Sequence, residues 1–119
     1  YFGQDESMSV RLATGVWVAA YLARLRSAGL AAYVVSKGDP TAGAVVVKLV
    51  RPGGMARAMA RRFDFETGAR VWAVLTEGGE REVDALLARE RARDPDLWLI
   101  DVEDMGGMGL LDAEGLADG

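Results

Sequence analysis

Apolar side chains recur every three or four residues in the segment that follows Thr14, which is the spacing of one face of an α-helix. Val18, Leu22 and Leu25 form this face. Thr14 can cap the start of the helix, and Gly29 suits the left-handed position that commonly follows a helix. The pattern therefore predicts a first helix between these two residues.

A second helix is predicted over residues 80–93. Val83, Leu86 and Leu87 carry its apolar face. Acidic residues crowd its first turns and arginines its last, an arrangement that complements the helix dipole. The Asp-Pro-Asp sequence at 94–96 then ends the helix.

Four short runs rich in apolar residues predict β-strands. The run at 44–50 is apolar on both alternating faces, which is typical of a central strand. The last run also has the composition of a buried strand. The four predicted strands are residues 31–36, 44–50, 69–76 and 97–103.

Residues 55–63 give conflicting signals. Alanine, methionine and arginine favour a helix in this segment. However, no capping residue opens it, a Pro-Gly-Gly turn precedes it, and the sequence at 64–68 is typical of a hairpin connection. We predict a further strand, with a helix as the alternative.

The predicted order is helix, four strands, helix and strand. If the first four strands form a meander, the second helix can return the chain so that the last strand pairs antiparallel with the first, giving a sheet order of 5-1-2-3-4. The expected fold class is α+β: a two-layer domain with a mainly antiparallel sheet of four to five strands and both helices on one face.

The ends of the chain differ in composition from its middle. Residues 1–7 precede Met8 and suggest the remnant of an engineered protease site, so the domain is expected to span residues 8–104. Residues 105–119 are acidic and rich in glycine, which favours a mobile tail. The sequence contains no apolar run of membrane-spanning length and no signal-peptide pattern, so we expect a cytoplasmic protein without a membrane partner.

The chain contains no cysteine and no histidine. These absences exclude disulfides, the usual zinc, haem and iron–sulfur ligands, and catalytic triads that use imidazole. The net charge of −4 is divided unevenly, with +6 on residues 1–62 and −10 on residues 63–119. Such opposed halves favour internal ion pairs or head-to-tail self-association.

The alternation of side chains along the strand predicted at residues 55–63 gives one candidate interaction surface. Met55 and Met59 would share a face with Arg57 and Arg61, which makes that face half apolar and half charged. We therefore take Met55, Met59 and Trp98 as candidate residues for self-association, as a homodimer, or for contact with another cytoplasmic protein.

Arginines and one turn give a candidate binding site for anions. Arg57, Arg61 and Arg62 could contact phosphate groups, and Asp39 occupies a tight turn. The glycine pairs fit neither a dinucleotide fingerprint nor a phosphate loop. The sequence pI of about 4.8 disfavours nucleic acid as the partner.

Asp101 and Glu103 are a weak candidate for a metal site. They would project from the same side of one strand, and carboxylate oxygens suit Mg²⁺. No calcium-loop motif accompanies them. A strand end with its carboxylates paired to arginines is the favoured interpretation, so we predict no cofactor.

Together these motifs resemble the bacterial domain-of-unknown-function family 1491. The segments that carry the resemblance are Arg11-Leu12 with Gly15-Val16-Trp17-Val18, then Lys37 to Val45 (KGDPTAGAV), and Asp94 to Asp104 (DPDLWLIDVED). The resemblance implies a small α+β protein of the proteobacterial cytoplasm, and it implies no activity.

Three functions stay open at this point. The leading hypothesis is a non-enzymatic interaction module that self-associates, because the charge is divided and catalytic groups are lacking. The alternative is a small protein that binds an anion or a nucleotide. A Mg²⁺-dependent enzyme that uses Asp101 and Glu103 comes third.

Overall fold

The computed structural model describes residues 12–104 and 106–112. It confirms the predicted order of helices and strands, with a short 3₁₀ turn, Pro52–Gly54, inserted before the third strand. The elements are α2 (Thr14–Ser27), β1 (Ala31–Ser36), β2 (Val45–Arg51), β3 (Met55–Asp64), β4 (Ala69–Gly79), α3 (Glu80–Arg93) and β5 (Trp98–Glu103).

The predicted α+β class is confirmed, but the predicted strand order is wrong. The five strands are arranged β1-β5-β2-β3-β4. The last strand does pair antiparallel with β1, as expected, but it lies between β1 and β2 and runs parallel to β2. The physical reason is burial: β5 is apolar on both faces and gains most from a central position, whereas β1 is largely exposed and occupies the edge.

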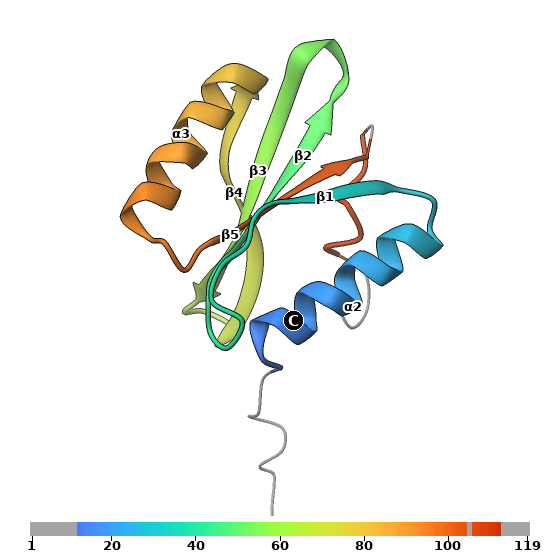
Figure 1. Cartoon of the computed structure of the whole chain (residues 1–119). Coiled ribbons are helices and arrows are strands. Elements are labelled where there is room, and N and C mark those ends of the chain that lie inside the picture. Colours follow the sequence, from blue (N-terminus) through green and yellow to red (C-terminus); the bar gives the residue numbers. More distant parts are fainter. Residues whose placement is uncertain (1–11, 105, 113–119) are drawn as a thin grey trace, which may run out of the picture.

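The two helices lie on opposite faces of the sheet, so the expectation of both on one face is also wrong (Figure 1). The side chains of β2, which point alternately to the two faces of the sheet, show this directly. Val47 and Leu49 pack in one cluster with α2, whereas Val46 packs in a second cluster with Val83 of α3. Because β2 and β5 are apolar on both faces, each face needs a covering layer.

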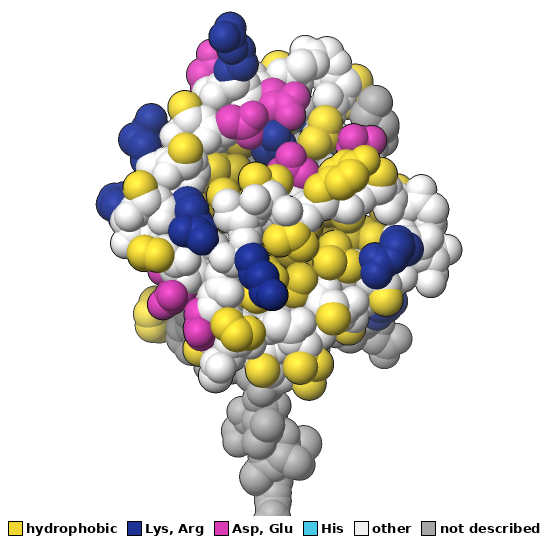
Figure 2. All heavy atoms as spheres, in the orientation of Figure 1, with side chains coloured by type: hydrophobic (Ala, Val, Ile, Leu, Met, Phe, Trp, Pro, Cys, Tyr) yellow, Lys and Arg dark blue, Asp and Glu magenta, His cyan; other side chains and the backbone are white. Residues whose placement is uncertain are grey.

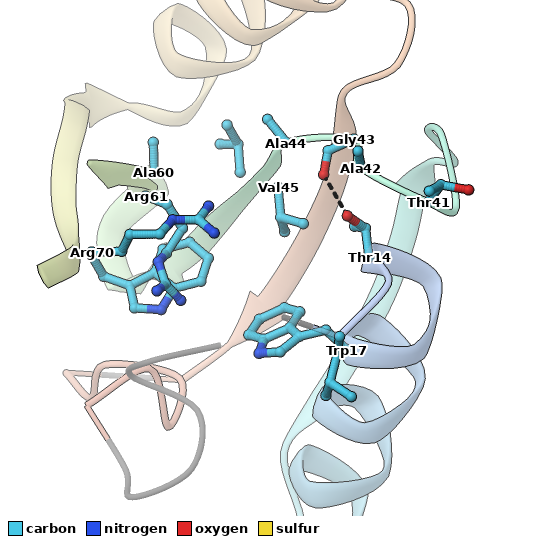
Figure 3. Close-up of a pocket in the computed structure, with 13 residues that line it drawn as sticks. Thr14, Trp17, Thr41, Ala42, Gly43, Ala44, Val45, Ala60, Arg61 and Arg70 are labelled. Atoms are coloured by element: carbon cyan, nitrogen blue, oxygen red, sulfur yellow. Dashed lines mark hydrogen bonds between the residues drawn. The ribbon is translucent and has the colours of Figure 1, made fainter. Parts of the chain in front are cut away.

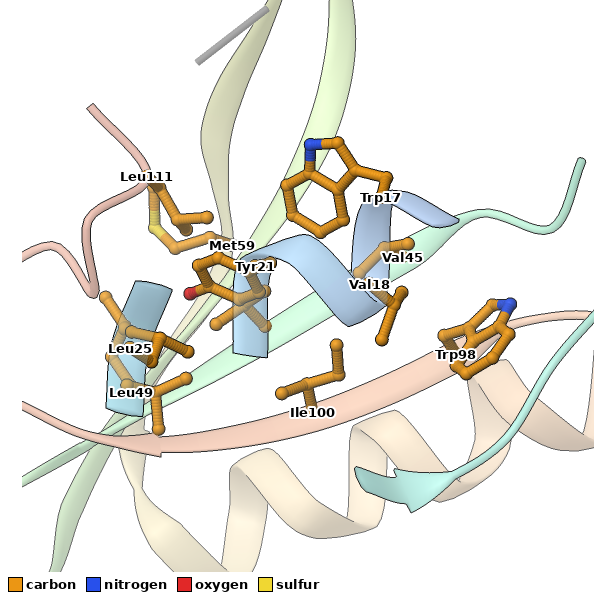
Figure 4. Packing of buried hydrophobic residues seen from close by; sticks show 12 residues of the cluster. Trp17, Val18, Tyr21, Leu25, Val45, Leu49, Met59, Trp98, Ile100 and Leu111 are labelled. Atoms are coloured by element: carbon orange, nitrogen blue, oxygen red, sulfur yellow. The ribbon is translucent and has the colours of Figure 1, made fainter. Parts of the chain in front are cut away.

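The larger cluster lies under α2. Figure 4 shows Trp17, Tyr21 and Leu25 of this helix above Leu49 and Ile100 of the sheet. The second cluster lies under α3 and consists of Val46, Ala56, Ala58, Val83, Leu87, Leu97 and Leu99. The sheet is therefore the middle of three layers.

The segment with conflicting signals forms β3, as predicted. Met55–Asp64 pairs along its length with both β2 and β4. Its small residues Ala56 and Ala58 face α3, and Met59 faces α2. Pairing on both sides and burial on both faces thus outweigh the helix propensity of the segment.

Part of the expected tail belongs to the domain. Residues 1–7 and 113–119 lie outside the described residues, but residues 106–112 pack against the α2 side of the core. Leu111 is fully buried there, and the Tyr21 hydroxyl donates a hydrogen bond to the Gly109 carbonyl. The expectation of a mobile tail is therefore wrong for this portion.

Candidate functional site

Two turns that the sequence marks with Asp-Pro pairs meet at one end of the sheet. The backbone N–H of Asp39 donates to the Asp96 carbonyl at 3.0 Å. The indole N–H of Trp98 donates to the Asp39 carbonyl at 2.8 Å. A Cβ atom at Gly38 or Gly43 would collide with the Asp96 carbonyl oxygen, so these two positions need glycine for close approach.

The start of α2 is fixed to the same turn. Its first backbone N–H groups, on Thr14 and Gly15, donate to the carbonyls of Thr41 and Pro40 at 3.1 and 2.7 Å. Thr14 was expected to cap the helix, but its hydroxyl instead donates to the Gly43 carbonyl at 2.8 Å. The turn and the helix therefore form one rigid corner.

A cavity of about 380 Å³ opens between this corner and the β3–β4 hairpin. Figure 3 shows Trp17 and Thr14 on one side of it and Arg61 and Arg70 on the other. The described lining residues are Leu12, Thr14, Trp17, Thr41, Ala42, Gly43, Ala44, Val45, Val46, Ala60, Arg61, Arg70 and Trp72. None of them is acidic. We call this cavity the two-arginine pocket.

Two tryptophan rings form part of the wall of the two-arginine pocket. The guanidinium carbon of Arg61 lies 5.1 Å from the centre of the Trp72 ring, a cation–π distance. The Trp17 ring lies 5.7 Å from that of Trp72 and stacks on Tyr21 at 4.8 Å. The pocket thus combines positive charge with flat apolar surfaces.

Comparison with known proteins identifies the chain. The family model described as "Protein of unknown function (DUF1491)" matches residues 12–112. The chain belongs to the DUF1491 family. No curated protein matches it.

Three solved structures are similar to this fold, and two of them are described as DUF1491 family proteins. A crystal structure of a family member from Caulobacter crescentus CB15 is 38% identical, covers 79% of this chain and 89% of its own, and gives a TM-score of 0.71. An NMR structure from the same organism is 36% identical, covers 85% and 91%, and gives 0.70. The solution structure of protein Atu0922 from A. tumefaciens is 30% identical, covers 80% and 87%, and gives 0.66.

Of the arginines predicted to bind anions, the structure of this DUF1491 protein brings only Arg61 into the pocket. Arg57 forms a 2.7 Å ion pair with Glu77 outside it. Arg62 follows Arg61 on the strand, so it points to the opposite face, where it is exposed. The sequence analysis missed Arg70, which joins Arg61 from the neighbouring strand.

Asp39 is engaged inside its own turn. Its carboxylate accepts the Ala42 N–H at 2.8 Å, and its carbonyl accepts the Gly43 N–H at 3.1 Å. Asp39, which the sequence analysis took as a binding residue, therefore holds in place the turn that forms part of the pocket wall.

The predicted interaction surface is only partly at the surface. Met59 and Trp98 are buried in the α2 cluster, so the proposal that they form a contact surface is wrong for this fold. Met55 is exposed. Strand alternation placed Met59 correctly on one face, but α2 covers that part of the face.

Asp101 belongs to a cluster around a buried lysine, which the sequence analysis did not single out. Lys48 is 3% exposed on the α3 face of β2. It donates hydrogen bonds to Glu80 and Asp84 at 2.8 and 2.7 Å and lies 3.4 Å from Asp101. Figure 2 shows acidic side chains gathered near the end where α3 begins. We call these four residues the Lys48 cluster.

Burial and the neighbouring charges together shift the pKa of two members of the Lys48 cluster. Burial acts to lower the Lys48 pKa, but the hydrogen bonds to Asp84 and Glu80 and the charge of Asp101 outweigh it and raise that pKa. Burial raises the pKa of Asp101, and Lys48 offsets part of this effect. The cluster therefore holds a charged lysine that anchors α3 and β5 to β2.

The metal hypothesis finds no support in this geometry. The carboxylate of Asp101 faces Lys48, whereas Glu103 is exposed and lies two residues along the strand. Across the described residues, no three or more acidic side chains are placed to share a metal ion. Within the same residues no helix is long and apolar enough to cross a bilayer.

Proposed function

We propose that this DUF1491 protein is a non-enzymatic binding protein that takes up a small organic anion in the two-arginine pocket. The observation that carries the proposal is the composition of the wall. Two arginines and two tryptophans line a cavity of about 380 Å³, and its described lining contains no carboxylate.

Electrostatics favours an anion in such a site. Guanidinium groups pair with carboxylates or phosphates through two parallel hydrogen bonds, and partial exclusion of water strengthens the attraction. The positive end of α2 also points to this corner. The volume lies in the range of small-molecule sites, roughly 300–1,000 Å³.

The polar groups of the pocket suit binding better than turnover. Besides the arginines and tryptophans, the polar side chains of the described lining are Thr14 and Thr41. The Thr14 hydroxyl already donates to the Gly43 carbonyl. No activated nucleophile or general base is apparent among these residues, which supports a non-enzymatic role.

Calorimetric titration tests the proposal with two aromatic anions, 1-naphthoate and 1-naphthyl phosphate. We expect at least one to bind the wild-type protein and to bind Arg61→Gln at least tenfold more weakly. Arg57→Gln is the matched control, because Arg57 lies on the same strand and face but outside the pocket. Binding that both variants leave unchanged would contradict the proposal.

A second candidate function is self-association through the edge strand β1. Tyr33, Val34 and Val35 are all exposed on this edge, and the strand carries no charged residue or proline that would block pairing. An antiparallel pair of β1 strands from two copies would extend the sheet across a homodimer.

Light scattering tests this second candidate. Val35→Lys places a charge on the edge, and we expect it to convert a dimer to a monomer. Val16→Lys is the matched control, because Val16 is equally exposed but lies on α2. A wild-type protein that stays monomeric at high concentration would exclude the dimer.

A further inference from the structure

The outer edge of β1 lies between an acidic end and a basic end. Ala31, the first residue of the strand, pairs with Glu103, and Tyr33 pairs with Asp101. Glu103 is exposed, and so is Lys37, which directly follows the strand at its other end. The two ends of this short edge therefore carry opposite charges.

The charges of both ends lie near the α3 face of the sheet. Asp101 faces Lys48 there, and Glu103, two residues further along β5, points the same way. At the basic end, Arg91 of α3 donates a hydrogen bond to the Lys37 carbonyl at 3.1 Å. Figure 2 shows acidic side chains gathered where α3 begins, with basic side chains below them.

Two β1 edges could pair in either direction, and the charges distinguish the two arrangements. In a parallel pair, ends of equal charge lie together. In an antiparallel pair, the acidic end of each copy lies beside the basic end of the other, and the α3 faces of both copies lie on the same side of the extended sheet. The edge is therefore complementary in charge to a second copy of itself only in the antiparallel arrangement.

The directions of the β1 side chains favour one register. Directly opposite residues of an antiparallel pair lie on the same face of the sheet. Ala32 packs on the α2 side, and Val34, which is opposite Ile100, points to that side as well. The pairing becomes irregular between Val34 and Ser36. A two-fold axis at Tyr33 keeps the regular part of the strand paired, because Ala32 then lies opposite Val34 of the other copy.

We infer that two copies of this chain pair antiparallel through β1, with Tyr33 at the two-fold axis and Lys37 of each copy beside Glu103 of the other. Tyr33 is 58% exposed in the single chain, so pairing removes part of its ring from water. The inference rests on the second candidate function and adds the register and the charges that direct it. The two-arginine pocket takes no part in this interface.

Disulfide cross-linking tests the register. The sequence contains no cysteine, so a single introduced cysteine can pair only with the same residue of another copy. Under mild oxidation, Tyr33→Cys should form a covalent dimer on a non-reducing gel. Ala31→Cys is the matched control, because it lies on the same edge but more than about 10 Å from its own copy, beyond the reach of a disulfide. Dimers of Ala31→Cys, or none of Tyr33→Cys, would overturn the register.

Charge reversal tests the two ion pairs by sedimentation equilibrium. Lys37→Glu and Glu103→Lys should each raise the dimer dissociation constant about tenfold. The double variant rebuilds the pairs with their signs exchanged, so its dissociation constant should return to within about twofold of the wild-type value. Glu66→Lys is the matched control, because Glu66 is exposed in the turn between β3 and β4 and should not affect the dimer. A double variant no better than the single ones would overturn the ion pairs.

The outcomes separate the inference from the function on which it rests. A wild-type protein that stays monomeric would overturn both. A dimer that Val35→Lys disrupts, but that neither charge reversal affects, would keep the second candidate function and overturn this inference alone. Cross-linking of Tyr33→Cys together with recovery in the double variant would support both.

Discussion

Two groups of basic side chains lie on opposite faces of one sheet and differ in what surrounds them. On the α3 face, three carboxylates gather around Lys48. On the α2 face, Arg61 and Arg70 line a cavity whose described wall includes no acidic residue. The first arrangement binds one part of the protein to another. We propose that the second attracts an anion from outside the protein.

The comparison shows why net charge is a poor guide to a binding site. The whole chain is acidic, with a net charge of −4, yet this small cavity is lined by two cations. Nearby acids determine whether a cation is structural or available to a ligand, because Coulomb attraction falls with distance and with screening. Among the described residues, no carboxylate lines this cavity, whereas three surround Lys48.

The largest expected effect is on the stability of the Lys48 cluster. Lys48→Met leaves three carboxylates close together without their cation, and we expect the free energy of unfolding to fall by about 3 kcal/mol. All three carboxylates are partly exposed, which limits the loss. Urea denaturation measures the change.

Arg57→Gln is the control for this prediction. It breaks a more exposed ion pair with Glu77 and should lower the free energy of unfolding by less than about 1 kcal/mol. If Lys48→Met and Arg57→Gln lowered the free energy of unfolding equally, the buried ion pairs of Lys48 would be no more stabilising than the exposed pair of Arg57.

The next effect concerns the corner that forms the pocket wall. Gly43→Ala brings a Cβ atom against the Asp96 carbonyl, so we expect a loss of about 2 kcal/mol in urea denaturation, together with weaker anion binding. Gly53→Ala has open space but a φ of +72°, and should lose about 1 kcal/mol from backbone strain without any change in binding. Normal binding by a destabilised Gly43→Ala would mean that the corner does not shape the pocket.

A smaller effect is expected at alkaline pH. Because the folded-state pKa of Lys48 is raised, the unfolded chain releases this proton first, at about pH 10.4. The stability that Lys48 contributes is therefore present below this pH and is lost as the pH rises above it. Burial of Tyr21, with a smaller effect from the charge of Asp104, also raises its pKa and adds a loss of the same sign.

Urea denaturation between pH 9 and pH 11 isolates the lysine contribution. The free energy of unfolding of the wild-type protein should fall more steeply than that of Lys48→Met, since Tyr21 contributes equally to both proteins. Parallel curves would contradict the assignment of the raised pKa to Lys48.

The local elements could be predicted from the sequence because each depends on its own pattern. Turn signals on both sides identified β3 despite its helix formers, and Gly68, with a φ of +74°, turns the chain between β3 and β4. The pairing of that hairpin places Arg61 opposite Trp72. The hairpin register could therefore have pointed to the pocket wall before the fold was known.

Longer-range pairing could not be predicted in the same way. Lys48 lies beside Asp101 only because β5 inserts next to β2, whereas the predicted order placed β5 at the edge. Likewise, Glu80 and Asp84 reach Lys48 only because α3 covers the face opposite α2. Both features depend on which distant segments of the chain become buried against one another. The local spacing of apolar residues does not specify these partners.

The central claim is that the cations of the two-arginine pocket serve an external anion. Calorimetric titration of 1-naphthoate into the wild-type protein, Arg61→Gln and Arg57→Gln tests it most directly. We predict saturable binding to the wild-type protein and to Arg57→Gln, and at least tenfold weaker binding to Arg61→Gln. Equal affinities for all three proteins, or no binding to any of them, would contradict it.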